Sequence, residues 1–266
     1  MTSLAGIVNV TTDSFSDGGR FISSEAAIAH GQSLLDAGAD WLDLGAESSN
    51  PKGQAVSAQV EWERLAPVIH HFVARGVKLS VDTHKPEVMT RALAEGVAMV
   101  NDVNSLRTPG ALEAVAKHPA AQVVLMFARN EGPRAEVKEQ PYATLILEMR
   151  EFFKERLRIL AAAGIERSRV LLDPGMGFFL GATPEPSLFA LKYLAELKTL
   201  GCRLYVCTSR KSFIGAVLGG RPPSERGIGT LATELWAVNA GVDFIRTHDV
   251  GPLREALTVW KAIESI

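Results

Sequence analysis

The sequence predicts an α/β fold, a single-domain (β/α)₈ TIM barrel of eight parallel strands that covers residues 1–266. Short β-branched or Leu-rich runs alternate with amphipathic helical stretches along the whole chain. A glycine recurs between a helical stretch and the next strand, at positions 76, 96, 164, 201 and 241. Eight such units in 266 residues favour a closed barrel, with an open doubly wound sheet as the alternative.

The individual elements follow from this alternation. The expected strands are Gly6–Val10, Trp41–Leu44, Val77–Val81, Met99–Asn101, Gln122–Met126, Val170–Leu172, Arg203–Val206 and Phe244–Arg246. Helical stretches follow them, including Ser24–Asp36, Ala58–Ala74, Pro86–Glu95, Tyr142–Ala162 and Pro252–Ser265. Long connections follow the first, second and fifth strands, on the face where barrels of this type build their active sites.

Composition excludes several classes of function. A net charge of -2, without acidic or basic blocks, gives no nucleic-acid footprint. No apolar run reaches the roughly 18 residues of a membrane span, and the first residues lack a basic leader, so we expect a cytoplasmic protein. Cys202 and Cys207 would lie roughly 16 Å apart on one strand, too far for a disulfide, which tolerates about 7 Å.

Polar residues cluster where the expected strands end. They are Asn9, Glu47, Asp82, Asn101, Asp102, Asp173, Ser209, Arg210, Lys211, Arg246 and His248. One such residue alone would be read as a helix cap. Because the set is drawn from seven strands of one barrel, it predicts a site at the carboxyl ends.

The chemistry of this set indicates the kind of ligand. Asp82, Asn101 and Asp173 offer carboxylates and an amide to a flat heterocycle with N–H donors and ring nitrogens. Arg210, Lys211, Arg246 and His248 offer positive charge and donors to phosphate or carboxylate, although Lys211 could also be a Schiff-base lysine. Ser212 begins the next helix and adds backbone N–H groups. The simplest ligand has a planar polar head and an anionic tail.

The segment from Asn9 to Gly19 is a long polar loop after the first strand. It is either a turn-rich connection or a lid that carries hard oxygen ligands. Mg²⁺ is usually held by one or two protein oxygens together with substrate phosphates and water. The sequence has no His/Cys/Asp spacing typical of a zinc site.

Several motifs together resemble the dihydropteroate synthase family. The segment from Asn9 to Gly19 is similar to its first signature, and residues 43–51 match its second in part. Further matches are Val81–Lys85, Asn101–Val103, Asp173–Phe178, Ser209–Phe213 and Arg246–Asp249. They span nearly the whole chain in the family's order, which makes the resemblance specific although each motif alone is weak.

The resemblance implies a role for each matching residue. Asp82, Asn101, Asp173 and Lys211 would bind the pterin. Asn9, Arg246 and His248 would bind diphosphate, with Asn9 also reaching Mg²⁺, and Lys211, Arg246 and His248 would serve catalysis. The residues around 4-aminobenzoate would be Phe15, Ser49, Pro51, Phe178, Phe179 and Ser212.

The resemblance also implies the reaction and the assembly. In this family diphosphate leaves the pterin first, and the arylamine of 4-aminobenzoate then attacks a pterin-methylene cation. Such a reaction needs charge stabilisation more than proton transfer. The family further implies a homodimer.

The chain departs from the family at several positions. Asn50 replaces an Arg that helps to hold diphosphate, Phe127 replaces a His, and Ala46 replaces a Gly. Phe179-Leu180 replaces a common Gly-Lys, and this run resembles the sulfonamide-insensitive branch. Phe179 would then either narrow the aminobenzoate pocket or pack under the following helix. A pterin-binding methyltransferase and a non-catalytic paralogue remain as alternatives.

Overall fold

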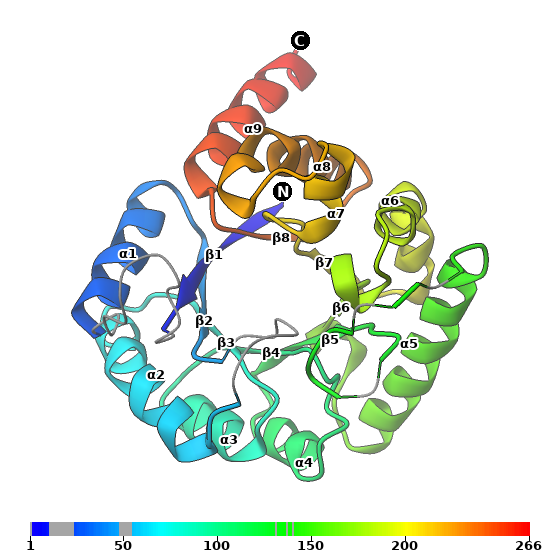
Figure 1. Ribbon diagram of the computed structural model, residues 1–266. Helices are drawn as coiled ribbons and strands as arrows, with labels where there is room; N and C mark the ends of the chain where they lie inside the picture. The colour runs from blue at the N-terminus through cyan, green and yellow to red at the C-terminus, as the bar shows by residue number, and fades with distance from the viewer. Residues whose placement is uncertain (1, 11–23, 48–54, 131, 137, 140) are drawn as a thin grey trace.

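A computed structural model shows a closed barrel of eight parallel strands surrounded by helices (Figure 1), as the sequence predicts. It describes residues 2–10, 24–47, 55–130, 132–136, 138–139 and 141–266. Each strand pairs in parallel with its neighbours in sequence, and β8 closes the barrel on β1. The open doubly wound sheet is therefore excluded.

The strands are short and lie near their expected positions. They are β1 (Ser3–Asn9), β2 (Trp41–Gly45), β3 (Leu79–Asp82), β4 (Met99–Asp102), β5 (Gln122–Met126), β6 (Val170–Asp173), β7 (Arg203–Val206) and β8 (Phe244–Thr247). The expectation that β1 starts at Gly6 is wrong by three residues, because Ser3 and Leu4 pair with β8. Several other strand ends shift by one or two residues.

Helices form the outer ring in Figure 1. They are α1 (Ser24–Asp36), α2 (Ala58–Val73), α3 (Pro86–Ala94), α4 (Ala111–Ala116), α5 (Leu145–Ala162), α6 (Glu185–Lys192), α7 (Ser212–Val217), α8 (Gly227–Asn239) and α9 (Val250–Glu264). Short 3₁₀ turns are η1 (Arg167–Arg169), η2 (Gly177–Phe179), η3 (Leu194–Leu200) and η4 (Pro223–Glu225). The Ser57 side chain caps α2, and Pro86 begins α3, where its missing N–H costs nothing.

The glycines before the strands have the predicted conformation. Gly76, Gly96, Gly164, Gly201 and Gly241 have φ between 70° and 100°, a region that other residues rarely adopt. Each ends a helical segment and turns the chain back toward the barrel. Both cysteines are free and buried, in line with the sequence expectation. Within the described residues, no helix is both long and apolar enough to span a membrane.

Two layers of side chains fill the barrel. An apolar layer is made by Ala5, Trp41, Met99, Val124, Leu171, Tyr205 and Phe244, which pack together as one cluster. Because side chains alternate along a strand, residues two positions further point into the barrel again. On β2, β4, β6 and β8 these are Asp43, Asn101, Asp173 and Arg246. The fold thus places a polar layer directly above an apolar floor, at the carboxyl ends of the strands.

Candidate active site

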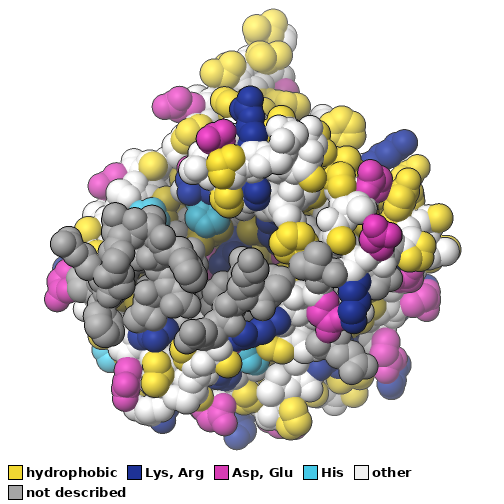
Figure 2. Space-filling model, in the orientation of Figure 1, with side chains coloured by type: hydrophobic (Ala, Val, Ile, Leu, Met, Phe, Trp, Pro, Cys, Tyr) yellow, Lys and Arg dark blue, Asp and Glu magenta, His cyan; other side chains and the backbone are white. Residues whose placement is uncertain are grey.

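The polar layer opens into a cavity of about 530 Å³ at the barrel mouth. Seven of the predicted polar residues line it, namely Asp82, Asn101, Asp173, Arg210, Lys211, Arg246 and His248, and so do Phe178, Phe179 and Ser212. Figure 2 looks onto this mouth, where basic side chains lie in the hollow at the centre. The strand-end residues therefore converge on one concave surface, as an active site requires.

Arg246 is held by two carboxylates inside the barrel. Its Nε donates to Asp43 Oδ2, and its Nη2 donates to Asp82 Oδ2 at 2.7 Å. Asn101 Nδ2 also donates to Asp43 Oδ2, at 3.2 Å. Burial would lower the pKa of Arg246, but Asp43 and Asp82 raise this pKa well above its usual value. Asp43 was not identified as a site residue from the sequence, although it stands two residues after Trp41 on the inward-facing side of β2.

Burial leaves two carboxyl groups of the cavity easily protonated. It raises the pKa of Asp82 to about 7, against the opposing effect of Arg246. It raises the pKa of Asp173 to about 6, against the effect of Lys211. Shifted carboxyl groups in a cleft are typical of functional sites. Asp173 can therefore change protonation near neutral pH when a ligand binds, whereas Asp82 is paired with Arg246.

The loop after β6 fixes the geometry around Asp173. Asp173 Oδ1 accepts a hydrogen bond from the backbone N–H of Gly175 at 2.8 Å. Gly175 has a φ of 68°, and a Cβ there would lie 2.2 Å from the carbonyl oxygen of Phe127. Only glycine fits this position. The close approach of the two loops places Asp173 and the following η2 turn at the edge of the cavity.

Asp102 has a different task from its neighbour Asn101. Its two carboxylate oxygens accept hydrogen bonds from the backbone N–H groups of Asn104 and Leu106, both at 2.7 Å. Burial raises the pKa of Asp102 to about 6, although these bonds oppose the shift. Asp102 does not line the cavity. It holds the turn after β4 and caps no helix, since α4 begins only at Ala111 with Gly110 before it.

His248 and Ser209 meet where β8 and the segment after β7 lie side by side. Ser209 Oγ lies 2.9 Å from His248 Nδ1. Burial, helped by Arg246 and Arg210, lowers the pKa of His248 to about 4, so its ring is neutral at pH 7. Arg210, at a φ of 56°, forms a two-point ion pair with Asp249. Lys211 and Ser212 follow, and Ser212 begins α7 as predicted.

Glu47 belongs to a charged cluster beside the cavity that the sequence did not reveal. Lys85 Nζ contacts both Glu47 Oε2 and Glu61 Oε2, and Arg134 Nη2 lies 3.2 Å from Glu47 Oε1. Burial alone would raise the pKa of Glu47, but Lys85 and Arg134 hold this pKa below its usual value. The cluster joins the ends of β2 and β3, α2 and the loop after β5.

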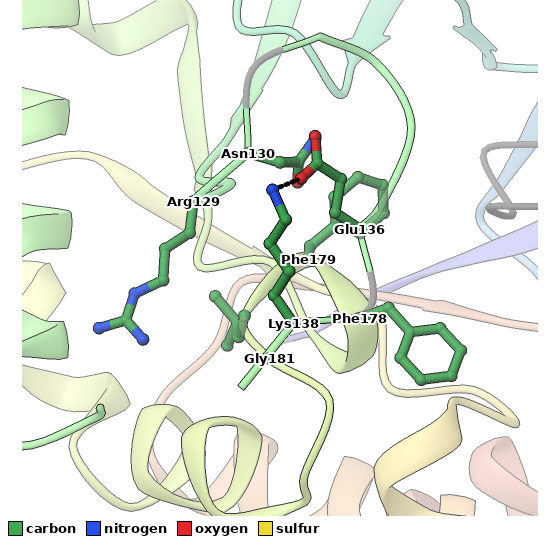
Figure 3. Close-up of a pocket in the computed structure, with 8 residues that line it drawn as sticks. Arg129, Asn130, Glu136, Lys138, Phe178, Phe179 and Gly181 are labelled. Atoms are coloured by element: carbon green, nitrogen blue, oxygen red, sulfur yellow. Dashed lines mark ion pairs between the residues drawn. The ribbon is translucent and has the colours of Figure 1, made fainter. Parts of the chain in front are cut away.

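Phe178 and Phe179 separate the central cavity from a second one of about 310 Å³, since both residues line both cavities. Figure 3 shows the second cavity, where Lys138 is paired with Glu136 and Arg129 points away. Phe179 packs with Met126, Ala128 and Ala135. The Lys211 ammonium lies 5.9 Å from the centre of the Phe179 ring. Phe179 therefore faces the site and does not pack under the following helix.

The remaining predicted residues are placed as follows. Asn9 ends β1 with an exposed side chain and pairs with Gly45 of β2, on the same face as the cavity. Phe15, Ser49 and Pro51 lie outside the described residues, and so does Asn50. The departure Phe127 packs edge-on against Phe152 and is also close to Phe153. Its ring faces α5 and does not line the cavity.

Comparison with known proteins shows which family has this sequence and fold. The family model of the pterin binding enzymes matches residues 5–248. The type-2 dihydropteroate synthase of Escherichia coli is 44% identical over 260 residues, which cover 97% of this chain and 95% of the relative.

The chain belongs to the dihydropteroate synthase family. Two solved structures of the Xanthomonas albilineans member also match over the full length of this chain and 94% of theirs. The one with 4-aminobenzoic acid has a TM-score of 0.91 at 42% identity. The one in complex with 7,8-dihydropteroate has a TM-score of 0.87 at 41% identity. Family membership thus rests on both sequence and fold along the whole chain.

Proposed function

We infer that the protein is a transferase of folate biosynthesis, a dihydropteroate synthase. It joins 6-hydroxymethyl-7,8-dihydropterin diphosphate to 4-aminobenzoate and gives 7,8-dihydropteroate and diphosphate. The observation that carries this proposal is the convergence of the pterin-type and anion-type residues of the family in one cavity. The ligands named for the Xanthomonas albilineans structures are one substrate and the product of this reaction.

Asp82, Asn101, Asp173 and Lys211 form the proposed pterin site. Their carboxylates, amide and ammonium line the floor and wall of the cavity, where a flat heterocycle would be enclosed. A buried ring N–H is costly unless it is paired, so a carboxylate opposite it gives both affinity and orientation. Asp173 is buried beside the apolar layer and is the strongest candidate for this contact.

Asn9, Arg246 and His248 form the proposed diphosphate site, and Lys211, Arg246 and His248 the proposed catalytic set. Arg246 is now engaged by Asp43 and Asp82, which hold its guanidinium in place at the cavity. When diphosphate leaves, negative charge builds up on the bridging oxygen. Fixed cations and N–H donors stabilise that charge without reorganising. The arylamine is already neutral at pH 7 and can attack without a general base.

The donor chemistry at the end of β1 fits Mg²⁺. Asn9 offers a hard amide oxygen, and Mg²⁺ readily takes its other ligands from phosphate and water. Asn9 would hold the ion on the protein side. When bound, the ion would neutralise charge on the diphosphate.

The wall formed by Phe178, Phe179 and Ser212 is the described part of the proposed aminobenzoate site. We propose that Phe179 also makes the enzyme insensitive to sulfonamides. These drugs copy 4-aminobenzoate but carry a bulkier tetrahedral sulfonyl group. An aromatic ring that already fills space at the cavity wall can clash with that bulk and still accept a planar carboxylate.

We also propose a homodimer, as the family resemblance implies. Large apolar side chains are exposed on neighbouring helices, with Leu188 on α6, Val217 on α7, and Ile228 and Trp236 on α8. Contiguous exposed apolar groups mark association surfaces, and a two-fold axis would pair this surface with itself. A cytoplasmic location stays a prediction; the free, buried cysteines suit a reducing compartment.

A diphosphate-release assay tests the proposed function. The purified protein is mixed with the pterin diphosphate, with and without 4-aminobenzoate, and both diphosphate and dihydropteroate are measured. Release of diphosphate together with formation of dihydropteroate supports the proposal. Pterin binding without product would favour the non-catalytic paralogue, and methyl transfer to a corrinoid would favour the methyltransferase.

A further inference from the structure

We propose that a buried chain of three side chains, Glu234, Thr247 and Ser209, fixes the tautomer of His248. The chain would keep the ring proton on Nε2 and so present an N–H donor to the substrate. This inference rests on the proposed function, in which His248 contacts the departing diphosphate. The three residues would be positioning residues, since none of them touches the substrate.

The chain runs from helix α8 to the cavity. The Glu234 carboxyl group is hydrogen-bonded to the Thr247 hydroxyl. Thr247 Oγ1 lies 3.4 Å from Ser209 Oγ, which in turn lies 2.9 Å from His248 Nδ1. Glu234, Thr247 and Ser209 are only 1%, 0% and 4% exposed. Bulk water therefore has little access to these groups, and their hydrogens must be shared within the chain.

Backbone contacts restrict the directions in which the hydroxyl hydrogens can point. The N–H of His248 donates to Ser209 Oγ at 3.1 Å, and the N–H of Asp249 donates to Thr247 Oγ1 at 3.1 Å. Each hydroxyl oxygen thus already accepts one proton and still has one of its own to donate. Thr247 donates toward Ser209. Ser209 then donates to His248 Nδ1, which must be unprotonated.

Glu234, at the α8 end of the chain of side chains, determines which way the Thr247 hydroxyl hydrogen points. Burial raises the pKa of Glu234 to about 8 although the Thr247 hydroxyl lowers it, so the protonated form prevails at pH 7 and can donate to Thr247 Oγ1. An ionised Glu234 would instead accept the Thr247 hydrogen and turn it away from Ser209. The other oxygen, Oε1, is buried without a hydrogen-bond partner among the described atoms, a costly state for a charged carboxylate.

A neutral imidazole needs such a constraint. Burial lowers the pKa of His248 to about 4, so at pH 7 the ring holds one proton that can sit on either nitrogen. Which nitrogen carries it is decided by the hydrogen bond at the other one. With Nδ1 occupied as an acceptor by Ser209, Nε2 is the nitrogen left to donate into the cavity that His248 lines.

Nitrogen NMR tests the tautomer directly. Long-range ¹H–¹⁵N spectra of the labelled, ligand-free protein distinguish protonated from unprotonated ring nitrogens, and His248→Gln assigns the signals. We expect a single Nε2–H tautomer in the native protein and a mixture in Ser209→Ala. Ser209→Thr, which restores a hydroxyl, should return the native spectrum. A native Nδ1–H tautomer, or an unchanged tautomer in Ser209→Ala, would overturn the proposal.

Variants further along the chain separate positioning from packing. Glu234→Gln keeps a donor toward Thr247 and should preserve the Nε2–H tautomer, whereas Glu234→Leu should loosen it. Ser80→Ala is the matched control, since Ser80 is another buried serine whose hydroxyl has no partner among the described atoms. A change of tautomer in Ser80→Ala, or none in Glu234→Leu, would contradict the assigned chain.

Kinetics then link the tautomer to the reaction. Ser209→Ala should lower kcat about tenfold or more while KM for 4-aminobenzoate stays nearly constant, as when an outer partner of a functional histidine is lost. A native protein that releases no diphosphate would refute the proposed function and leave the tautomer measurement untouched. An unchanged kcat in a variant whose tautomer is mixed would refute the link to catalysis.

Discussion

Residues two positions apart on one strand have opposite chemical tasks in this protein. The Phe244 ring of β8 stacks on Tyr205, with 6.1 Å between the ring centres, and lies edge-on to Trp41, with 5.9 Å between the centres. These rings close the floor of the barrel. Arg246, two residues on, is a mostly buried cation between two carboxylates. The apolar layer excludes water from below, so the charges above it interact in a medium of low polarity, where electrostatic effects are strong.

Asp173 is the residue whose contribution to pterin binding can be measured most directly. Replacing it by Ala would leave a buried ring donor unpaired, which costs about 1–3 kcal/mol. Calorimetric titration with a pterin analogue should show that loss. Its pKa of about 6 adds a pH dependence. The ionised form accepts from ring N–H groups, so affinity should rise about tenfold from roughly pH 5 to 7 and then level off.

Asp173→Asn is the matched control for this pH effect. It keeps an acceptor oxygen but has no group that titrates. Its affinity for the pterin analogue should therefore not show the rise with pH that ionisation of Asp173 causes. Equal affinity of the native protein and Asp173→Ala would remove Asp173 from the pterin site.

Phe179 carries the prediction about drugs. In Phe179→Gly the space beside Lys211 opens, and the tetrahedral sulfonyl group should fit. We expect the native enzyme to resist a sulfonamide and the variant to be inhibited at least about tenfold more strongly, which corresponds to roughly 1.4 kcal/mol. Inhibition is measured together with KM for 4-aminobenzoate. A native enzyme that is already sensitive, or a variant with the same resistance, would contradict the role of Phe179.

Two further predictions concern diphosphate, the proposed ligand of His248 and Asn9. His248→Ala should slow diphosphate departure about a hundredfold, in the range known for loss of one charge-stabilising donor. Binding of the bare pterin should be nearly unchanged. Chelation of divalent ions should lower turnover, and added Mg²⁺ should restore it. Turnover that is unaffected by a chelator would show that Asn9 has no metal to hold.

At the scale of elements, the charged cluster around Lys85 holds the barrel mouth together. Lys85 lies between Glu47 at the end of β2 and Glu61 on α2, and Arg134 brings in the loop after β5. These side chains are mostly buried, so the pairs matter more than ion pairs on the surface. The cluster thereby holds the described end of β2 against α2 and the loop after β5.

Lys85→Met should therefore destabilise the protein by about 3–5 kcal/mol, because two buried carboxylates would lose their shared cation. Without Lys85, burial would raise the folded-state pKa of Glu47 above the unfolded one. Stability would then fall further as pH rises toward this raised value. Thermal unfolding at several pH values measures both effects. Adding Glu61→Gln should recover part of the loss, and Lys154→Met, in an exposed pair on α5, should change little. A Lys85→Met variant as stable as the native protein would contradict this role.

The sequence predicted elements well because each strand and each helix end carries a local signal. Alternating apolar runs and glycines before strands place the eight units, and strand ends place seven cavity residues. Contacts between distant segments have no such signal. Asp43 and Arg246 are 203 positions apart and meet only through barrel closure. The sequence showed that Phe127 replaces a His of the family, but it could not show where the side chain points. In the structure the ring points toward Phe152.

At the scale of the whole molecule, the exposed apolar side chains on α6, α7 and α8 form the surface of the proposed dimer. These helices are neighbours on one side of the barrel (Figure 1). Ile228 is 84% exposed and Trp236 is 56% exposed. Trp236 also donates from Nε1 to the carbonyl oxygen of Leu191, which fixes its ring across α8 and α6. Rigid aromatic and aliphatic groups of this kind form the centre of stable interfaces.

A charge placed on this surface should therefore separate the two copies. We expect the native protein to be a dimer in sedimentation velocity and Ile228→Glu to be a monomer, since each dimer would bury two unpaired carboxylates facing the same apolar surface. Leu147→Glu is the matched control, because Leu147 is 65% exposed on α5, away from α8. It should remain dimeric. The monomer should keep the cavity, so its affinity for a pterin analogue should be close to native. A native monomer would refute the homodimer, and an Ile228→Glu protein that stays dimeric would place the interface elsewhere.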